Sequence, residues 1–188
     1  MRRMRQDENL IGRVDRFLQD VGVGVDGLRV SDDYRIHSLH HMAGSEVPVE
    51  FDFQAMESNG TQRLFGLAGP VLDAFDSGAM IVADEFECSM HTLLTRRLIE
   101  LYHSSGANKA GAQLLLATHD TSLLDLSIFR RDQIWLADKD ERQATQLWSL
   151  FDIEEKPRKT EAIRKNYLSG RYGAVPVFGR IFEDRVAP

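Results

Sequence analysis

Two carboxylates follow an apolar run near the middle of the chain. Residues 79–83 read AMIVA, and Asp84 and Glu85 come directly after them. A short uninterrupted apolar run is typical of a strand buried on both faces of a parallel sheet, and ligands bind at the carboxyl ends of such strands. Adjacent acids there point in different directions, so one could hold Mg²⁺ through water while the other orients or deprotonates an attacking water. The alternative is a strand that ends in two solvated acids.

A second apolar run ends in a histidine. Residues 112–117 read AQLLLA, and Thr118, His119 and Asp120 follow. If this run is the neighbouring strand, His119 lies at the same sheet edge as the two acids and could reach a phosphate oxygen bound there. The alternative is a histidine beside the N-cap of the next helix, with Asp120 as the capping residue.

The third candidate is the polar turn Ser58-Asn59-Gly60, which directly precedes a predicted helix. Backbone N–H groups at a helix N-terminus point outward and form a natural seat for phosphate. The alternative is purely structural, with Ser58 or Asn59 as the N-cap and Gly60 relieving the turn. As part of a surface turn, Gly60 is expected to tolerate replacement at a cost of about 1 kcal/mol if its φ is negative.

The rest of the sequence predicts the helices and strands that must position these residues. Apolar residues spaced three or four apart predict helices, and alternation of apolar and polar residues predicts strands. The predicted helices are residues 7–20, 61–75 (kinked by Pro70), 91–104, a short one near 121–126 and an amphipathic segment at 160–168. The predicted strands are residues 28–38, 46–53, 79–83, 112–117, 133–137 and 144–150, the last two antiparallel with Trp135 and Trp148 in the core. This order predicts an α/β fold with a mainly parallel sheet flanked by helices, in a single domain over residues 1–188.

The amino-acid composition of the chain excludes several classes of function. The chain has 188 residues, with 23 Lys and Arg against 29 Asp and Glu and a net charge of −6. Such an acidic chain is not expected to coat DNA, although a local basic patch stays open. The single cysteine, Cys88, excludes an internal disulfide and a cysteine-rich zinc site and fits a reducing cytoplasm. No apolar run approaches the ~20 residues that span a bilayer, so we expect a cytoplasmic protein with no membrane partner.

Two further groups of polar residues have an alternative without function. His37, His40 and His41 are spaced so that they could hold a metal, but no cysteine assists them, and solvated side chains are favoured. A set of basic residues could line a strip for nucleic acid, but interspersed acids favour a solvated face. These basic residues are Arg130, Arg131, Arg158, Lys159, Arg164 and Lys165.

The order and spacing of the three motifs resemble an ABC-type ATPase lobe of the ABC/SMC/Rad50 clade. ESNGTQR resembles the signature motif, AMIVADE the Walker B strand and THD the H-loop. Longer segments resemble the C-terminal part of AAA15-type ATPases, which are bacterial ABC-like ATPases found in restriction-linked and abortive-infection (anti-phage) loci. These segments are ESNGTQRLFGLAGPVLDAFDSG, DEFECSMHTLLTRRLIELY, AQLLLATHDTSLLD, RRDQIWLADKD and YLSGRYGAVP, within residues 10–178.

The resemblance implies a P-loop NTPase-like fold, ATP and Mg²⁺ as ligands, and a role for each motif. Asp84 would hold Mg²⁺, Glu85 would act on the water, and His119 would hold the γ-phosphate. Residues 58–60 would contact the γ-phosphate of an ATP held by the opposite protomer, because these ATPases sandwich nucleotide between two heads. Residues 88–91 would form the D-loop, a segment that contacts the other protomer.

The expected partners follow from a missing motif. The sequence contains no G-x-x-x-x-G-K-[ST] and no Gly-Lys pair, so the family's phosphate-binding Walker A loop is absent. We therefore expect an ATP-sandwiched homodimer or a partner chain that carries Walker A, and little ATP hydrolysis by the isolated chain. Family context suggests anti-phage defence with a nuclease effector, and nucleic acid stays open as a partner. The alternatives are a DNA-repair or recombination ATPase of the Rad50/RecF type, and a non-catalytic module that regulates a full-length ATPase.

Overall fold

The computed structural model of the protein describes residues 8–154, 157 and 162–176. The chain divides into two compact units, the first ending at Asp120 and the second beginning at Thr121. The first unit carries all the residues that the sequence singles out for chemistry.

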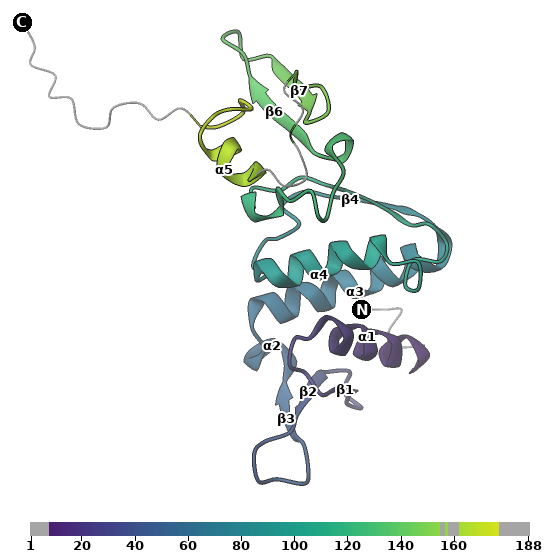
Figure 1. Ribbon diagram of the computed structural model, residues 1–188. Coiled ribbons are helices and arrows are strands. Elements are labelled where there is room, and N and C mark those ends of the chain that lie inside the picture. Colours follow the sequence, from purple (N-terminus) through teal and green to yellow (C-terminus); the bar gives the residue numbers. More distant parts are fainter. Residues whose placement is uncertain (1–7, 155–156, 158–161, 177–188) are drawn as a thin grey trace, which may run out of the picture. The chain divides into compact units, whose positions relative to one another are not determined.

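The first unit is a layered α/β structure. In Figure 1, helices α1, α3 and α4 lie between a three-stranded sheet and a two-stranded one, and they pack on each other and on both sheets. Its elements are α1 (Glu8–Val21), β1 (Gly27–Val30), β2 (Ile36–His40), β3 (Val49–Asp52), α2 (Phe53–Met56), α3 (Asn59–Ser77), β4 (Met80–Ala83), α4 (Thr92–His103) and β5 (Gln113–Leu116). Its core consists mainly of apolar side chains from α1, α3 and α4, including Val14, Leu18, Leu64, Val71, Leu98 and Ile99.

The strands pair in two different ways. Strands β1, β2 and β3 form an antiparallel sheet, while β4 and β5 form a parallel pair with Ala83 opposite Leu116. The α/β class is therefore confirmed, but the strands of the described residues form only one parallel pair rather than a mainly parallel sheet. The predicted strand 28–38 is in fact two strands, because residues 31–35 form a tight turn in which the Tyr34 N–H donates to the Ser31 carbonyl at 2.8 Å. A connection this short can join only antiparallel strands.

The parallel pair is covered by helices on one face, where its side chains are half-buried, and is exposed on the other, so the burial on both faces predicted for residues 79–83 is wrong. Helix α3 packs on β4 and helix α4 packs on β5. Alternate side chains project from the other face, where Met80 is 58%, Val82 68% and Leu115 58% exposed. Since side chains alternate along a strand, layers on both faces would be needed to bury every residue of the run.

Helix α3 connects the polar turn to the parallel pair. It begins after the N-cap Ser58 and ends at Gly78, whose φ of 72° is left-handed. A side chain at Gly78 would bring its Cβ within 2.5 Å of the Ala110 carbonyl oxygen, so glycine is required there. Pro70 lies inside the helix, and the buried face consists of Thr61, Leu64, Ala68, Val71 and Ala74. This spacing of three and four residues is the amphipathic pattern seen in the sequence.

The second unit is a small hairpin domain. It contains two short 3₁₀ turns, η1 (Thr121–Leu123) and η2 (Arg131–Gln133), the antiparallel strands β6 (Trp135–Lys139) and β7 (Thr145–Ser149), and helix α5 (Ile163–Leu168). Its core is formed by Leu126, Ile134, Leu136, Leu150, Ile163 and Tyr172.

One face of this hairpin packs on the core of the second unit and the other does not. Trp148 lies on the packed face and is partly buried against the core. Trp135 is 56% exposed, so its predicted place in the core is wrong. It precedes the buried Leu136 by one position, and consecutive strand residues face opposite sides. The predicted segment 160–168 lies partly outside the described residues.

Candidate functional site

The two loops predicted to carry chemistry meet at one edge of the parallel pair. Because β4 and β5 run in the same direction in register, the residues that follow Ala83 and Leu116 lie side by side. The ladder extends beyond both strands, since the Ala117 N–H donates to the Ala83 carbonyl at 2.9 Å and the Phe86 N–H donates to the Ala117 carbonyl at 3.4 Å. The carboxyl-end edge therefore brings the loop of the two acids next to the loop of the histidine.

The acidic loop holds its two carboxylates toward solvent. Asp84 and Glu85 are both exposed, while the next residue, Phe86, is completely buried. Asp84 Oδ1 accepts the Glu85 N–H at 3.1 Å, and Glu85 has a left-handed φ of 47°. This conformation costs energy for a residue other than glycine, and the buried phenylalanine anchors the loop that imposes it. The pair is thus accessible to a hydrated metal ion and to water, as its predicted chemistry requires.

Glu87 joins the two loops, although it belongs to none of the motifs that the sequence indicates. Its Oε1 accepts the backbone N–H of His119 at 2.8 Å. Burial raises the pKa of Glu87, but hydrogen bonds from Thr118 and from the backbone N–H groups of Glu87 and His119 outweigh it, so the pKa lies below its ordinary value. Its other oxygen, Oε2, is buried without a hydrogen-bond partner among the described residues. The one feature of the sequence that could have indicated Glu87 is its position as a third acid, two residues after Glu85.

His119 has a fixed backbone and an exposed side chain. Its N–H is held by Glu87, and the following Asp120 N–H donates to Thr118 Oγ1 at 3.0 Å. The imidazole is exposed at the same edge as the two acids. The geometry thus brings His119, Asp84 and Glu85 to one edge, on loops that share a hydrogen bond.

The polar turn caps helix α3. Ser58 is the N-cap, and its Oγ accepts the Thr61 N–H at 3.1 Å. The prediction that Ser58 is the N-cap is therefore confirmed, and this role does not prevent the turn from binding phosphate. Among the residues that the structure describes, the N–H groups of Asn59 and Gly60 have no hydrogen-bond partner, and such groups at the start of a 19-residue helix attract anions.

Gly60 is held against the loop that follows β4. A Cβ added at Gly60 would lie 2.8 Å from the Ser89 carbonyl oxygen. The expectation that Gly60 tolerates replacement is therefore wrong, because backbone and not open solvent lies next to it. Ser89 has a φ of 63°, so the loop adopts an unusual conformation where it meets the turn.

The turn opens into a pocket between helices. The pocket is lined by the end of α1, the turn and the start of α4, namely Val21, Gly22, Val23, Ser58, Asn59, Gly60, Thr61, Ser89, His91, Leu93 and Leu94. The N-termini of α3 and α4 both border it, and each contributes a positive partial charge. The arrangement favours an anionic group in the pocket.

Glu57 fixes the turn to the antiparallel sheet. Its Oε1 accepts the Ser38 hydroxyl at 2.5 Å and lies 2.6 Å from His40 Nε2. Ser38 is completely buried, and the Glu57 side chain is 10% exposed. Its carbonyl also accepts the Gln62 Nε2–H at 2.9 Å. These contacts orient the chain directly before Ser58, and no spacing rule in the sequence indicates them.

The three histidines face three different carboxylates. His40 lies on Glu57, His37 Nδ1 lies 3.9 Å from Glu50, and His41 Nδ1 lies 3.3 Å from Asp26. No group of three His, Cys, Asp or Glu side chains within the described ranges is arranged to hold a metal ion.

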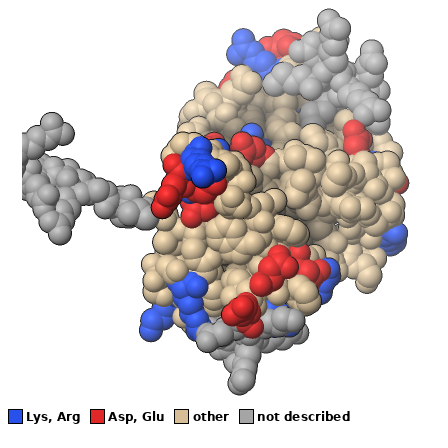
Figure 2. Space-filling model, turned by 90° about the horizontal axis from the view of Figure 1, so that it is seen from above, with Lys and Arg blue, Asp and Glu red and all other residues tan. Residues whose placement is uncertain are grey.

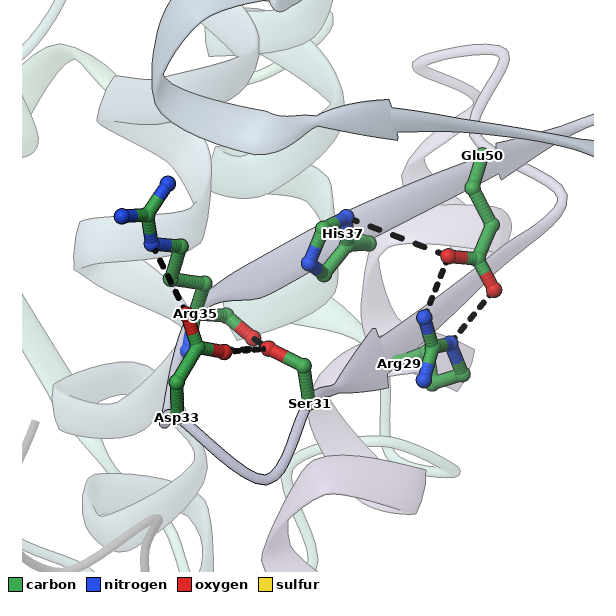
Figure 3. Close-up of polar contacts among 6 residues, drawn as sticks. All are labelled: Arg29, Ser31, Asp33, Arg35, His37 and Glu50. Atoms are coloured by element: carbon green, nitrogen blue, oxygen red, sulfur yellow. Dashed lines mark hydrogen bonds and ion pairs between the residues drawn. The ribbon is translucent and has the colours of Figure 1, made fainter.

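The His37 side of the antiparallel sheet carries a separate polar network. In Figure 3, the Arg29 guanidinium of β1 donates to both carboxylate oxygens of Glu50 of β3, and His37 of β2 lies beside them. In the turn between β1 and β2, Asp33 accepts the Ser31 hydroxyl and pairs with Arg35 at 3.0 Å. The Arg29 guanidinium holds the pKa of Glu50 below its ordinary value. This network joins the three strands.

The predicted basic strip is only partly described. Arg130 pairs with Asp132 at 2.8 Å, and Arg158 and Lys159 lie outside the described residues. The face in Figure 2 shows basic side chains in small separate groups, several of them beside acidic ones, and not in one continuous band. The basic strip therefore stays a prediction.

Comparison with known proteins gives one family and one fold. The family model described as "AAA domain, putative AbiEii toxin, Type IV TA system" matches residues 3–125. A solved structure concerned with ATP-driven dimerization and DNA-stimulated activation of SMC ATPases is similar, with a TM-score of 0.56, 16% sequence identity, and coverage of 81% of this chain and 89% of that one. At this identity the likeness concerns the fold, and it supports a P-loop NTPase-like fold. No curated protein matches the sequence.

Along the described chain, no helix combines the length and apolarity needed to cross a membrane.

Proposed function

The chain belongs to the AAA domain family described as a putative AbiEii toxin of type IV toxin–antitoxin systems, and on that premise we propose that it forms the signature, Walker B and H-loop part of an ATPase that hydrolyses Mg-ATP between two protein heads. The observation that carries this proposal is the parallel pairing of β4 with β5. It supports a shared role for Asp84, Glu85 and His119, which follow the two strands at one edge.

Each residue has a distinct task in the proposed reaction. Asp84 would hold the Mg²⁺, which neutralises phosphate charge when bound. Glu85 would accept a proton from the water that attacks the γ-phosphorus, as the bond to the ADP oxygen breaks. His119 would hydrogen-bond a γ-phosphate oxygen. The exposure of all three side chains supports contact with a substrate that arrives from outside the chain.

The second group of residues supports action in trans. Ser58, Asn59 and Gly60 line the pocket beside α4, and none of the three edge residues lines it. On this proposal, a nucleotide that contacts both groups is sandwiched between two chains. The related fold of an SMC ATPase studied for ATP-driven dimerization favours this arrangement.

A Walker A-bearing partner would complete the site. The sequence contains no G-x-x-x-x-G-K-[ST], and one face of the parallel pair exposes Met80, Val82 and Leu115. An exposed apolar face on parallel strands favours further covering structure supplied by a partner. On this proposal the complete protein is a cytoplasmic AAA15-type ATPase that acts in anti-phage defence with a nuclease effector. The missing loop equally favours a second function, a non-catalytic module that regulates a full-length ATPase.

The two functions are separated by turnover in a complete assembly. The chain is expressed with a Walker A-bearing chain from the same locus, and ATP hydrolysis and retained nucleotide are measured. Glu85→Gln should abolish hydrolysis yet retain ATP, because it keeps the shape of the side chain but removes the basic carboxylate. Asp84→Asn should lower nucleotide retention, and the exposed turn variant Glu141→Gln is the matched control. Hydrolysis at the parent rate in both edge variants would favour the regulatory module.

A further inference from the structure

His91 has one ring nitrogen in use and one unused. It is the N-cap of α4, and its Nδ1 accepts the Leu93 backbone N–H at 3.2 Å. A backbone N–H can only donate, so Nδ1 must be the acceptor, and the neutral ring therefore carries its proton on Nε2. Among the described residues, no hydrogen-bond partner occupies that Nε2–H.

The residue that carries this donor lines the pocket that holds the polar turn. The exposed His91 lines this pocket together with Asn59 and Gly60. The close approach of Gly60 to the Ser89 carbonyl, where a Cβ would be 2.8 Å away, holds the residues just before α4 against the turn. One hollow thus combines the N–H groups at the start of α3 with an imidazole donor whose tautomer is fixed by the backbone.

We propose that His91 is a further phosphate-binding residue, which donates its Nε2–H to an oxygen of the nucleotide phosphate that the polar turn receives. This inference rests on the proposed function, because it concerns the same pocket. A role as helix cap alone explains the Nδ1 contact, but it gives no reason for an exposed ring at the pocket wall, since a shorter Asn, Ser or Asp caps a helix at least as well.

Asparagine separates the two roles. In His91→Asn the side-chain oxygen still accepts a backbone N–H at the N-cap, so α4 should keep its stability. The shorter side chain does not reach the position of Nε2–H, so the phosphate loses one donor. The matched control is His103→Asn, which makes the same change at an exposed histidine at the other end of α4.

The test is an NMR titration of the full chain with Mg-ATPγS. Long-range ¹H–¹⁵N spectra should show the His91 proton on Nε2, and the Gly60 amide should shift with added nucleotide. In His91→Asn the Kd reported by that amide should rise about 10-fold, as expected for loss of one hydrogen bond to a charged group. His103→Asn should leave the Kd unchanged, and thermal melting should be the same in all three chains.

Three results would overturn the inference, and none of them by itself removes the proposed function. If His91→Asn binds within about twofold of the parent, His91 is a cap only. If the proton lies on Nδ1, that nitrogen cannot accept the Leu93 N–H and Nε2 has no hydrogen to donate, so both the cap contact and the phosphate contact fail. If the Gly60 amide of the parent does not move with millimolar Mg-ATPγS, the pocket of this chain does not receive phosphate and the role of His91 fails, whereas the proposed function, in which a Walker A-bearing chain holds the nucleotide, is tested separately by the turnover assay.

Discussion

Replacing Glu87 by alanine should loosen the loop that carries His119. The Glu87 carboxylate accepts the His119 N–H at 2.8 Å across 32 residues of sequence, and it is the side-chain contact that joins the two loops at the sheet edge. A hydrogen bond to a charged group contributes about 1.5–3 kcal/mol. Because Glu87 is only partly buried, we take the lower end, which corresponds to about a tenfold change in an opening equilibrium.

Hydrogen exchange at the His119 amide measures this change directly. In Glu87→Ala the amide should exchange about ten times faster than in the parent chain at pH 7, since local opening no longer breaks a charge-assisted bond. The control is Glu85→Ala, which removes an exposed acid two positions away that makes no contact with this amide. Equal protection of the His119 amide in Glu87→Ala and in the parent would refute the link between the loops.

The same bond should depend on pH in a stated direction. The pKa of Glu87 lies below its ordinary value of 4.5, so the folded state favours the ionised form. Its contribution is therefore fully present above the unfolded pKa and is lost as the pH falls through the lower folded pKa. The protection difference between the parent and Glu87→Gln should be constant from neutral pH down to about 4.5 and should shrink below it. A difference that grew on acidification would contradict this assignment.

Three further outcomes are expected. Gly60→Ala should lower the melting temperature, because its Cβ would lie 2.8 Å from the Ser89 carbonyl oxygen. Gly66→Ala in the same helix meets nothing within 4 Å and should stabilise the fold by about 0.5–1 kcal/mol. The reverse order of the two melting temperatures would disprove the close approach at Gly60. Ser58→Ala should cost about 1 kcal/mol through loss of the N-cap, as measured by urea unfolding, and an unchanged midpoint would contradict that contact. The isolated chain should hydrolyse little ATP, so Mg-dependent turnover of about 1–10 s⁻¹ would contradict the need for a partner.

The sequence predicted local features well where one residue type determines the geometry. Apolar periodicity located α3 and α4, and the run before Asp84 located β4, because each pattern reflects burial of a single face. Ser58 was foreseen as a cap, since its hydroxyl needs only the next turn of the helix. The turn that divides residues 28–38 was missed, because alternation continues across it.

Contacts between distant residues could not be predicted. Glu87 and His119 are 32 positions apart, and their bond exists only because β4 and β5 pair in register. Glu57 likewise meets Ser38 and His40 of another element. Exposure of Met80 and Val82 was also missed, since an apolar run does not reveal how many layers cover its strand.

The central claim is that one composite site uses residues of two chains, and a mixing experiment tests it. Glu85→Gln disables the edge of one head, and Asn59→Glu places a negative charge in the phosphate pocket of another. Asn59 is exposed at the first position of α3, where an acid favours the helix, so the fold should be kept. Each variant is assembled with a Walker A-bearing chain, and ATP turnover is measured alone and after mixing in equal amounts.

Each variant alone should be inactive, and the mixture should recover about a quarter of the parent rate, because half of randomly mixed dimers are heterodimers and each of these has one intact site of two. If both groups of residues served a nucleotide bound to their own chain, every head would carry a defect. Mixing would then restore no turnover, and that result would contradict the proposed composite site.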